Sequence, residues 1–454
     1  MTIKEIVSRQ REYFYTEETR SVTFRRAALK KLQAAIIRDE NKILGALKKD
    51  LNKSDFEGYM TEVGMVLDEL RFAIRHIRKW ARTKRAPTPL SHFHAKSFVV
   101  PEPYGVALIL SPWNYPFQLC IEPLVGAIAA GNCAVVKPSN YAPNISHVIA
   151  ELIASCFGPE YIAVVEGGRE QNAELLKEKF DYFFFTGSPE VGKLVMEAAS
   201  RNLTPVSLEL GGKSPCIVDQ TADLKCAAKR VAFGKYLNAG QTCVAPDYLL
   251  VHRSVKDQFV NHLKAAVKEF FPNGNYADMP VIINDKHFNR LLGLIKGEKI
   301  LSGGGSDKGR RFIEPTLLDD ITFDSPVMQE EIFGPILPVI TFERIDEVIS
   351  NVNTRPKPLA LYLFTGDKAI EDQVLKSVSF GGGCVNDTIM HVATSHMGFG
   401  GVGNSGMGKY HGHYSFDTFS HYKGIVKKYT WIDLPMRYHP YTKRNFKLVR
   451  FFLK

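Results

Sequence analysis

The chain lacks the cysteine pattern of a protein held together by disulfides. Its seven cysteines are an odd number and include no CxxC pair, and this favours reduced thiols. No apolar run approaches the roughly eighteen residues of a membrane-spanning helix. The N-terminus is charged throughout and lacks the apolar centre of a signal peptide. These absences predict a soluble, cytoplasmic protein.

Acidic residues are fewer than basic ones, with 48 Asp and Glu against 58 Lys and Arg, a formal charge of +10. Such a balance raises the question of nucleic-acid binding. No zinc finger, RRM signature or helix-turn-helix pattern accompanies the charge. The pairs His92/His94 and His411/His413 have no acidic or thiol partners for a metal set. We therefore predict no nucleic-acid partner and no metal.

The sequence alternates apolar runs with helical patterns in two successive regions after about eighty largely helical residues. The first region has apolar runs at 106–110, 133–136, 161–165, 182–185 and 206–210. The second has apolar runs at 214–219, 248–252, 336–342, 359–365 and 384–386. Buried strands separated by helices predict parallel sheets covered on both faces, with ligands at the carboxyl ends of the strands.

One cysteine lies where a thiol can act as a nucleophile. Cys243 ends the run Asn238-Ala-Gly-Gln-Thr-Cys243, which follows a helical pattern and contains a glycine turn. Free backbone N–H groups in such a turn favour the thiolate and can bind an oxyanion. Upstream, Glu209 stands in an apolar run before two glycines. A thiol and an embedded carboxylate indicate covalent catalysis followed by hydrolysis. Taken alone, Cys243 is more typical of a small buried side chain than of a nucleophile.

The predicted strand ends of the first region carry polar turns. Asn114 lies between two prolines and can donate an N–H to an oxyanion, although it also suits an ordinary turn. Lys137 at the next strand end suits a ribose or phosphate, or a solvated turn. The segment Thr186–Leu194 nearly spells a P-loop, but Leu194 replaces the hydroxyl that would hold magnesium. This loop still suits a dinucleotide pyrophosphate.

Seven motifs in order resemble those of the aldehyde dehydrogenase superfamily. They are PWNYP (112–116), KPS (137–139), FTGSPEVG (185–192), LELGGK (208–213), AGQTC (239–243), EEIFGP (330–335) and FGGVGNSGMG (399–408). The resemblance covers nearly the whole chain. The short N-terminus and the ending at 406–423 resemble the class 3 branch, which handles medium-chain, fatty and aromatic aldehydes.

The resemblance implies a role for each motif residue in NAD(P)-dependent oxidation of aldehydes to carboxylic acids. Cys243 would form the thiohemiacetal and thioester, Asn114 would hold the oxyanion, and Glu209 would activate water. NAD is the implied cofactor, with NADP as an alternative. The implied cofactor-binding residues are Trp113, Lys137, Thr186, Gly187, Ser188, Gly192, Glu331 and Phe333.

The implied fold is α/β, with a Rossmann-like cofactor domain, a catalytic domain and a small β element for bridging and oligomerisation. We expect residues 1–81 and 104–210 to bind the dinucleotide and residues 211–394 to form the catalytic domain. The bridging element would comprise 82–103 and 395–430, followed by a basic tail at 431–454. Class 3 relatives are typically dimers, so a homodimer is expected.

One residue departs from the family pattern. Relatives often carry a glutamate after KPS that binds the adenosine ribose hydroxyls, whereas this chain has Asn140. A neutral amide does not repel a 2′-phosphate, so NADP should be tolerated better here. Two other classes stay open: a relative that binds nucleotide without turnover, and one that passes the acyl group to phosphate or CoA. The presence of Cys243 and Glu209 favours hydrolysis.

The tail predicts a basic amphipathic helix. Lys443, Lys447, Arg450 and Lys454 share one helical face, and Phe446, Val449 and Leu453 share another. Such a helix suits an anionic membrane surface. Because its apolar face is short and no spanning segment follows, we favour packing on the enzyme itself, near the substrate entrance or a partner subunit.

Overall fold

The N-terminal region is helical, as predicted. The structure is a computed structural model that describes residues 1–453. Its first helices begin at hydroxyl side chains, Thr2, Ser21 and Ser54, that accept backbone N–H bonds and satisfy donors that a helix start leaves free. The helices are α1 (Ile3–Tyr15), α2 (Val22–Arg38), α3 (Glu40–Leu51), α4 (Asp55–Gly58), the π-helical turn η2 (Tyr59–Val63) and α5 (Gly64–Trp80).

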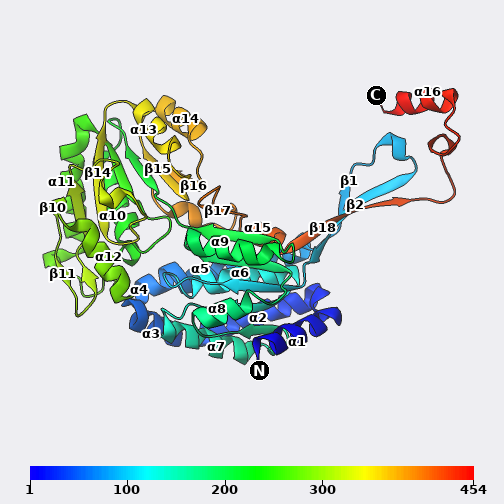
Figure 1. Cartoon of the computed structure of the whole chain (residues 1–454), viewed down its shortest axis with the longest axis horizontal. Helices are drawn as coiled ribbons and strands as arrows, with labels where there is room; N and C mark the ends of the chain where they lie inside the picture. Colours follow the sequence, from blue (N-terminus) through cyan, green and yellow to red (C-terminus); the bar gives the residue numbers. More distant parts are fainter. Residues whose placement is uncertain (454) are drawn as a thin grey trace.

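The first sheet has six strands in the order β17-β7-β6-β3-β4-β5. Its five predicted strands are parallel, with apolar runs buried beneath helices on both faces (Figure 1). They are β3 (Val106–Leu110), β4 (Cys133–Lys137), β5 (Ile162–Val164), β6 (Tyr182–Gly187) and β7 (Val206–Leu210). The connecting helices are α6 (Gln118–Ala130), α7 (Pro143–Cys156), α8 (Arg169–Leu175) and α9 (Pro189–Ser200).

The sixth strand of this sheet comes from the distant glycine-rich loop. Strand β17 (Gly406–Met407) pairs antiparallel with β7, and Gly406 lies opposite Glu209. A Cβ on Gly406 would lie 2.1 Å from the carbonyl oxygen of Leu208, so only glycine permits this approach. The loop therefore closes the sheet edge beside Glu209.

The second sheet has seven strands in the order β10-β13-β14-β9-β8-β15-β16. The predicted strands are β8 (Pro215–Val218), β9 (Tyr248–His252), β14 (Ile336–Phe342), β15 (Ala360–Phe364) and β16 (Gly382–Val385). The sequence analysis missed β10 (Lys299–Ser302) and β13 (Thr316–Asp319), which extend one edge. Its helices are α10 (Leu224–Tyr236), α11 (Lys256–Phe270), α12 (Asp285–Ile295), α13 (Ile345–Asn353) and α14 (Lys368–Ser377), and β11 (Ser306–Asp307) pairs with β12 (Phe312–Ile313). Two α/β sheets are thus present, as predicted.

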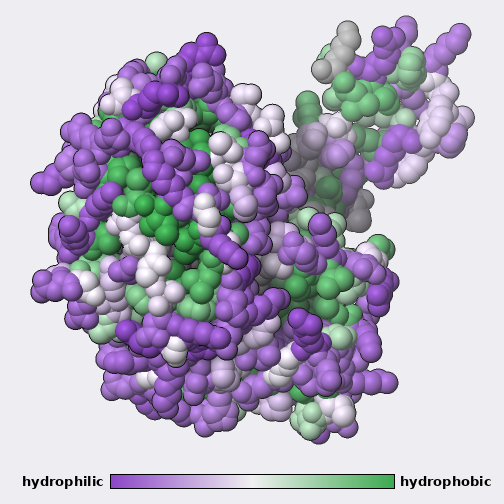
Figure 2. All heavy atoms as spheres, turned by 60° about the vertical axis from the view of Figure 1, so that its left-hand side comes forward, coloured by the Kyte–Doolittle hydropathy of each residue, from purple (hydrophilic) through white to green (hydrophobic). Residues whose placement is uncertain are grey.

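A long arm leaves the body of the molecule (Figure 1). It is a three-stranded antiparallel sheet in the order β1-β2-β18, made of β1 (Lys84–Ala86), β2 (Ala95–Pro103) and β18 (Ser420–Lys428). The short helix α15 (His413–Thr418) precedes β18, and α16 (Lys443–Phe452) lies at the tip of the arm. Apolar and charged side chains lie together on this tip (Figure 2).

The predicted tail helix forms, but it does not pack on the body of its own chain. No residue of α16 is buried, and Phe452 instead lines a hollow on the arm with Leu90, Phe93, Leu434 and Met436. Lys454, predicted to extend the basic face, lies outside the described residues. Packing on the enzyme's own body is therefore wrong for the described part of α16. A partner subunit and a membrane surface stay predictions for this helix, and no helix within residues 1–453 is long and apolar enough to cross a bilayer.

Candidate active site

A tight turn carries Cys243 into the contact between the two sheets. After α10 ends, Asn238 and Ala239 both adopt left-handed conformations with φ of 51°. Gly240 follows with φ of 73°, and a Cβ there would lie 2.2 Å from the carbonyl oxygen of Gly334. The chain can therefore turn only with glycine at this position. Cys243, three residues further on, is half-buried and unpaired.

The Cys243 thiol favours its protonated form. Burial, and after it the negative charges of Glu331 and Glu209, raise the pKa of Cys243 to about 12. The backbone N–H groups of Cys243 and Val244 act in the opposite direction and lower it. The sequence analysis expected these N–H groups to favour the thiolate; they do, but burial outweighs them.

Glu209 is an isolated carboxyl group in the sheet. It lies on β7 opposite Thr186 on β6, it is 3% exposed, and neither carboxyl oxygen has a hydrogen-bond partner. Burial raises the pKa of Glu209 well above its usual value. A carboxylate without partners is a strong proton acceptor once ionised, and this is the property that activation of water requires.

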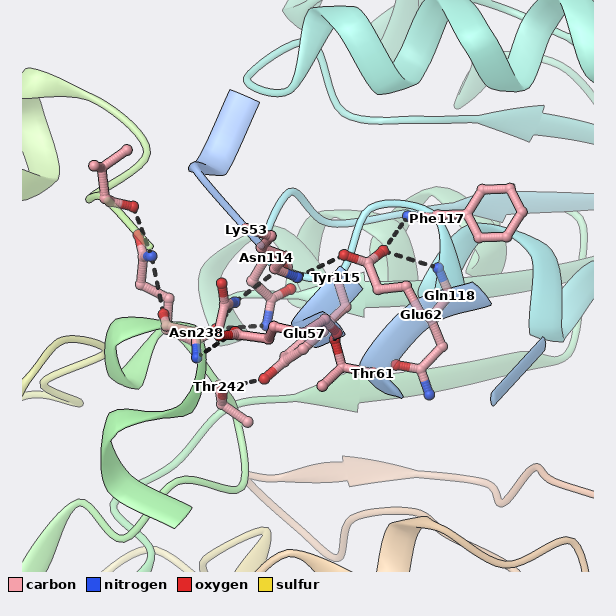
Figure 3. Close-up of polar contacts among 12 residues, drawn as sticks. Lys53, Glu57, Thr61, Glu62, Asn114, Tyr115, Phe117, Gln118, Asn238 and Thr242 are labelled. Atoms are coloured by element: carbon pink, nitrogen blue, oxygen red, sulfur yellow. Dashed lines mark hydrogen bonds and ion pairs between the residues drawn. The ribbon is translucent and has the colours of Figure 1, made fainter. Parts of the chain in front are cut away.

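Asn114 joins the two sheets at the nucleophile. It lies in the loop after β3 and is 3% exposed. Its Nδ2 donates to the carbonyl oxygen of Gln241 at 3.1 Å, two residues before Cys243. Next to it, Tyr115 and Thr242 share a hydroxyl hydrogen bond of 2.6 Å. Asn114 therefore lies against the turn that carries Cys243, beside Tyr115 and Thr242 (Figure 3), and an amide donor on that turn can serve an oxyanion.

The implied dinucleotide contacts lie at the carboxyl ends of β4 and β6. Lys137 ends β4, and burial lowers the pKa of its ammonium group to about 8. Its Nζ donates to the carbonyl oxygen of Pro138 at 2.7 Å. The buried hydroxyl of Thr186 has no partner. These polar groups are placed as a ligand with hydroxyls and phosphates would need, so the residues present fit a dinucleotide.

The glycines of the β6–α9 turn have packing roles as well. Ser188 caps α9 by accepting from the Val191 N–H at 3.4 Å, and the helix start faces the same strand ends. A Cβ on Gly187 would lie 2.5 Å from the ring of Phe185, and one on Gly192 would lie 2.7 Å from Leu210. Gly192 thus lets helix α9 approach β7 closely, and Gly187 leaves room for the Phe185 ring of its own strand β6.

Glu331, Phe333 and Trp113 gather near Cys243. A Cβ on Gly211 would lie 2.0 Å from Oε2 of Glu331, so glycine makes room for this carboxyl. Burial raises the pKa of Glu331 to about 8. Phe333 has φ of 51°, and its ring lies edge-on to Trp113 with centroids 5.3 Å apart. Trp113 from the first region of the chain and Phe333 from the second are therefore in contact.

Some buried polar residues of this region escaped the sequence analysis. Lys235, on the last turn of α10, is fully buried, and its Nζ has no hydrogen-bond partner; burial lowers its pKa to about 8. Lys53, between α3 and α4, and Glu57 and Glu62, in α4 and η2, bond to the loops of Asn114 and Cys243. A lysine and two glutamates in a charged helical segment look like a solvated face, so no sequence signal marks them. Among the described residues, no three His, Cys, Asp or Glu side chains gather as a metal site requires.

Comparison with known proteins places this chain in one family. The Aldehyde dehydrogenase family model matches residues 1–425. The chain is 50% identical over 446 residues to 4,4'-diaponeurosporen-aldehyde dehydrogenase of Staphylococcus aureus, covering 97% of each chain. It is 45% identical to mouse Aldehyde dehydrogenase family 3 member A2, covering 98% of this chain and 93% of that one.

Solved structures of aldehyde dehydrogenases also match this chain. The substrate-bound state of a Staphylococcus aureus AldH matches with a TM-score of 0.98 and 49% identity, and the match covers 100% of both chains. An NAD-dependent aldehyde dehydrogenase from Sinorhizobium meliloti matches with a TM-score of 0.86 and 27% identity, covering 95% of this chain and 88% of that one. The chain belongs to the aldehyde dehydrogenase family. The predicted superfamily, its class 3 branch, the α/β fold and an aldehyde-oxidising enzyme are thereby confirmed.

Proposed function

We propose that this enzyme oxidises aldehydes to carboxylic acids through a thioester on Cys243. Three observations on the candidate site support the proposal. The charge of Glu209 raises the pKa of the Cys243 thiol, Glu209 itself is buried without a hydrogen-bond partner, and Asn114 bonds to the turn that holds Cys243. These are the nucleophile, the proton acceptor and the oxyanion donor that acyl transfer requires.

In the first half of the reaction, the Cys243 thiol loses its proton and its sulfur bonds to the aldehyde carbon, giving a thiohemiacetal oxyanion. The Asn114 amide and the Cys243 backbone N–H donate to this oxygen. NAD(P), when bound, would supply the hydride acceptor that turns the thiohemiacetal into a thioester. Lys137 and Thr186 would hold the dinucleotide's ribose and phosphates at the ends of β4 and β6, and Gly187, Ser188 and Gly192 would let it approach α9. Glu331, Phe333 and Trp113 would position its nicotinamide end.

In the second half, Glu209 takes a proton from a water molecule as the water oxygen bonds to the thioester carbon. The carbon–sulfur bond then breaks, the acid leaves, and the Cys243 thiolate regains a proton. Because Glu209 has no hydrogen-bond partner to hold its charge, its ionised form is a strong base for this step.

The substrate class we propose is long or aromatic aldehydes. The support comes from the similarity to the diaponeurosporen-aldehyde dehydrogenase and to family 3 enzymes. A panel of aliphatic and aromatic aldehydes, followed by reduced nicotinamide and by product identification, tests the proposal. Carboxylic acid as product supports it; acyl phosphate or acyl-CoA, formed only when phosphate or CoA is added, would reassign the second half of the reaction.

We assign residues 1–81 and 104–210 to cofactor binding, 211–394 to the catalytic domain, and 82–103 with 395–430 to a bridging element that precedes the tail at 431–454.

We further propose a cytoplasmic homodimer that forms through this bridging element. The outer edge of β18 is unpaired in its sheet, and a nine-residue edge strand offers its backbone to another chain. Light scattering of the full chain tests this assembly, and a monomer at micromolar concentration would contradict it.

A further inference from the structure

We propose that a cluster of polar residues from the N-terminal region and the Cys243 turn positions Asn114 against that turn. The cluster, called here the Lys53 cluster, comprises Lys53, Glu57, Glu62 and Asn238. The inference rests on the proposed function, because it assumes that Asn114 holds the oxyanion. It assigns to Lys53 and Glu62, which lie outside the catalytic motifs, a positioning role in forming the tetrahedral intermediate.

The centre of the cluster is a fully buried ion pair. Lys53 Nζ and Glu62 Oε1 are 2.5 Å apart, and both side chains are 0% exposed. Burying two charges is costly unless further hydrogen bonds satisfy both partners. Lys53 also donates to the backbone oxygen of Asn114 at 3.0 Å, and its ammonium lies 4.1 Å from the centroid of the Tyr115 ring. Besides Glu62, the Lys53 ammonium therefore contacts the loop that carries the oxyanion donor, Asn114.

Glu62 fixes the other end of the same loop. Its Oε2 accepts from the backbone N–H of Phe117 at 2.7 Å and of Gln118 at 3.2 Å, where α6 begins. These are N–H groups that a helix start leaves without partners, and a carboxylate there is favoured by the helix dipole. The loop is thus held at Asn114 by Lys53 and at its end by Glu62, through one ion pair (Figure 3).

Asn238 extends the cluster into the Cys243 turn. Its Nδ2 donates to the Asn114 backbone oxygen at 2.8 Å and to the Gln241 oxygen at 3.0 Å. Its own backbone N–H donates to Glu57 Oε1 at 2.8 Å. The Asn114 side chain meets the same Gln241 oxygen. Asn238 and Asn114 thus both donate to the Gln241 oxygen. The cluster therefore connects the loop of Asn114, which follows a strand of the first sheet, to the Cys243 turn of the second sheet.

The Lys53 cluster should affect catalysis as well as stability, because its hydrogen bonds reach the loop of Asn114 and the turn of Cys243. They hold the backbone of Asn114, and its amide nitrogen, which gives one N–H to the Gln241 oxygen, has a second N–H for the reacting oxygen. An error of about 1 Å in such a donor can cost on the order of a hundredfold in rate. Glu62 also lies in η2, a π-helical turn, and such turns are frequent at functional sites. Removing the ion pair should shift Asn114 while leaving Cys243 itself in place.

The test uses the full-length enzyme with Lys53→Met and Glu62→Gln combined, so that neither charge of the ion pair is left buried without the other. An alkyl trifluoromethyl ketone reports the oxyanion site. Cys243 sulfur bonds to its carbonyl carbon, the thiol proton leaves to solvent, and the oxygen becomes an alkoxide with no hydride to lose. Alkylation of Cys243 by iodoacetamide reports the thiol alone, because that reaction forms no oxyanion.

The matched control is Arg25→Met. Arg25 is a buried cation of the same helical region that donates to the backbone oxygens of Thr19, Arg20 and Ala129, and no residue of the Lys53 cluster is among its partners. We expect the double variant to bind the ketone about tenfold to a hundredfold more weakly and to alkylate within about twofold of the wild-type rate. Arg25→Met should lower the melting temperature and change neither.

Two results would overturn the inference. One is unchanged ketone affinity in a double variant that is folded by circular dichroism. The other is a loss of ketone affinity that follows melting temperature equally in the double variant and in Arg25→Met. Failure of the proposed function itself looks different: wild-type enzyme would then oxidise no aldehyde and its Cys243 would form no adduct with the ketone.

Discussion

The side-chain nitrogen of Asn114 lies 3.1 Å from the carbonyl oxygen of Gln241. This bond joins a loop of the first sheet to the turn of the second sheet that carries Cys243. It places an amide donor beside the nucleophile before any substrate arrives, and such preorganised donors contribute strongly to acyl transfer.

Replacing Asn114 with alanine should therefore slow turnover much more than it weakens cofactor binding. We expect a fall in kcat of roughly a hundredfold to a thousandfold, the usual effect of removing one oxyanion donor. The dissociation constant for NAD, measured by quenching of tryptophan fluorescence, should stay near the wild-type value. A drop in kcat of less than threefold would remove Asn114 from the oxyanion site.

The reactivity of Cys243 should rise steadily with pH. Burial and two neighbouring carboxylates raise its pKa to about 12, so the thiolate fraction of the free enzyme increases tenfold per pH unit across neutral and mildly alkaline pH. Iodoacetamide labelling of Cys243, followed by peptide mass spectrometry from pH 7 to 10, should show this slope without a plateau. A plateau below pH 8 would mean that the backbone N–H groups dominate over burial.

The exposed Asn140 should make the enzyme tolerant of NADP. Asn140→Glu would place a negative charge near the 2′ position of the adenosine ribose and repel a 2′-phosphate. We expect the ratio of kcat/KM for NAD over NADP to increase by about tenfold or more, or about 1.4 kcal/mol. Asn140→Gln is the neutral control. An NAD preference above roughly a thousandfold in the wild-type enzyme, about 4 kcal/mol, would contradict the expectation.

Glu57 should make stability depend on pH near neutrality. Burial raises the pKa of Glu57 to about 7, above its usual 4.5, so the folded protein holds this proton more tightly than the unfolded chain does. Stability from this group is full below pH 4.5 and is lost as pH rises to about 7. Glu57→Gln should therefore be more stable than wild type at pH 8, by about 1–3 kcal/mol. Urea unfolding at pH 5 and pH 8 measures the difference, and an equal difference at both pH values would exclude Glu57 as its source.

The sequence predicts much of this fold because most sheet strands are continuous apolar runs that end in polar turns. Val106–Leu110 and Val206–Leu210 occur where they were predicted, since burial on both faces leaves a clear signal. Strands β10 and β13 were missed because β10 is a mostly exposed edge strand and β13 is only four residues long. The two-residue β17 forms only because Gly406 can approach Leu208, a contact between residues nearly two hundred positions apart.

The candidate site likewise contains residues that the sequence identifies and residues that it does not. Cys243, Glu209 and Asn114 stand in local patterns that a chemist can interpret, namely a turn, an apolar run and a loop rigidified by prolines. The ion pair of Lys53 and Glu62 has no such pattern, because its burial depends on how α4 and η2 pack against the Asn114 loop. The raised pKa of Cys243 likewise comes from burial and from Glu331, which the sequence places 88 residues away.

The most direct test of the central claim is the mass of Glu209→Gln enzyme after incubation with an aldehyde and NAD. Without the carboxylate that activates water, the thioester should accumulate. The predicted result is a burst of reduced nicotinamide of about one equivalent and an acyl group on the Cys243 peptide, with a mass two hydrogens below that of the aldehyde. Cys243→Ala should show neither the adduct nor turnover. Carboxylic acid formed at the wild-type rate with no adduct on Cys243, or near-normal turnover by Cys243→Ala, would contradict the account.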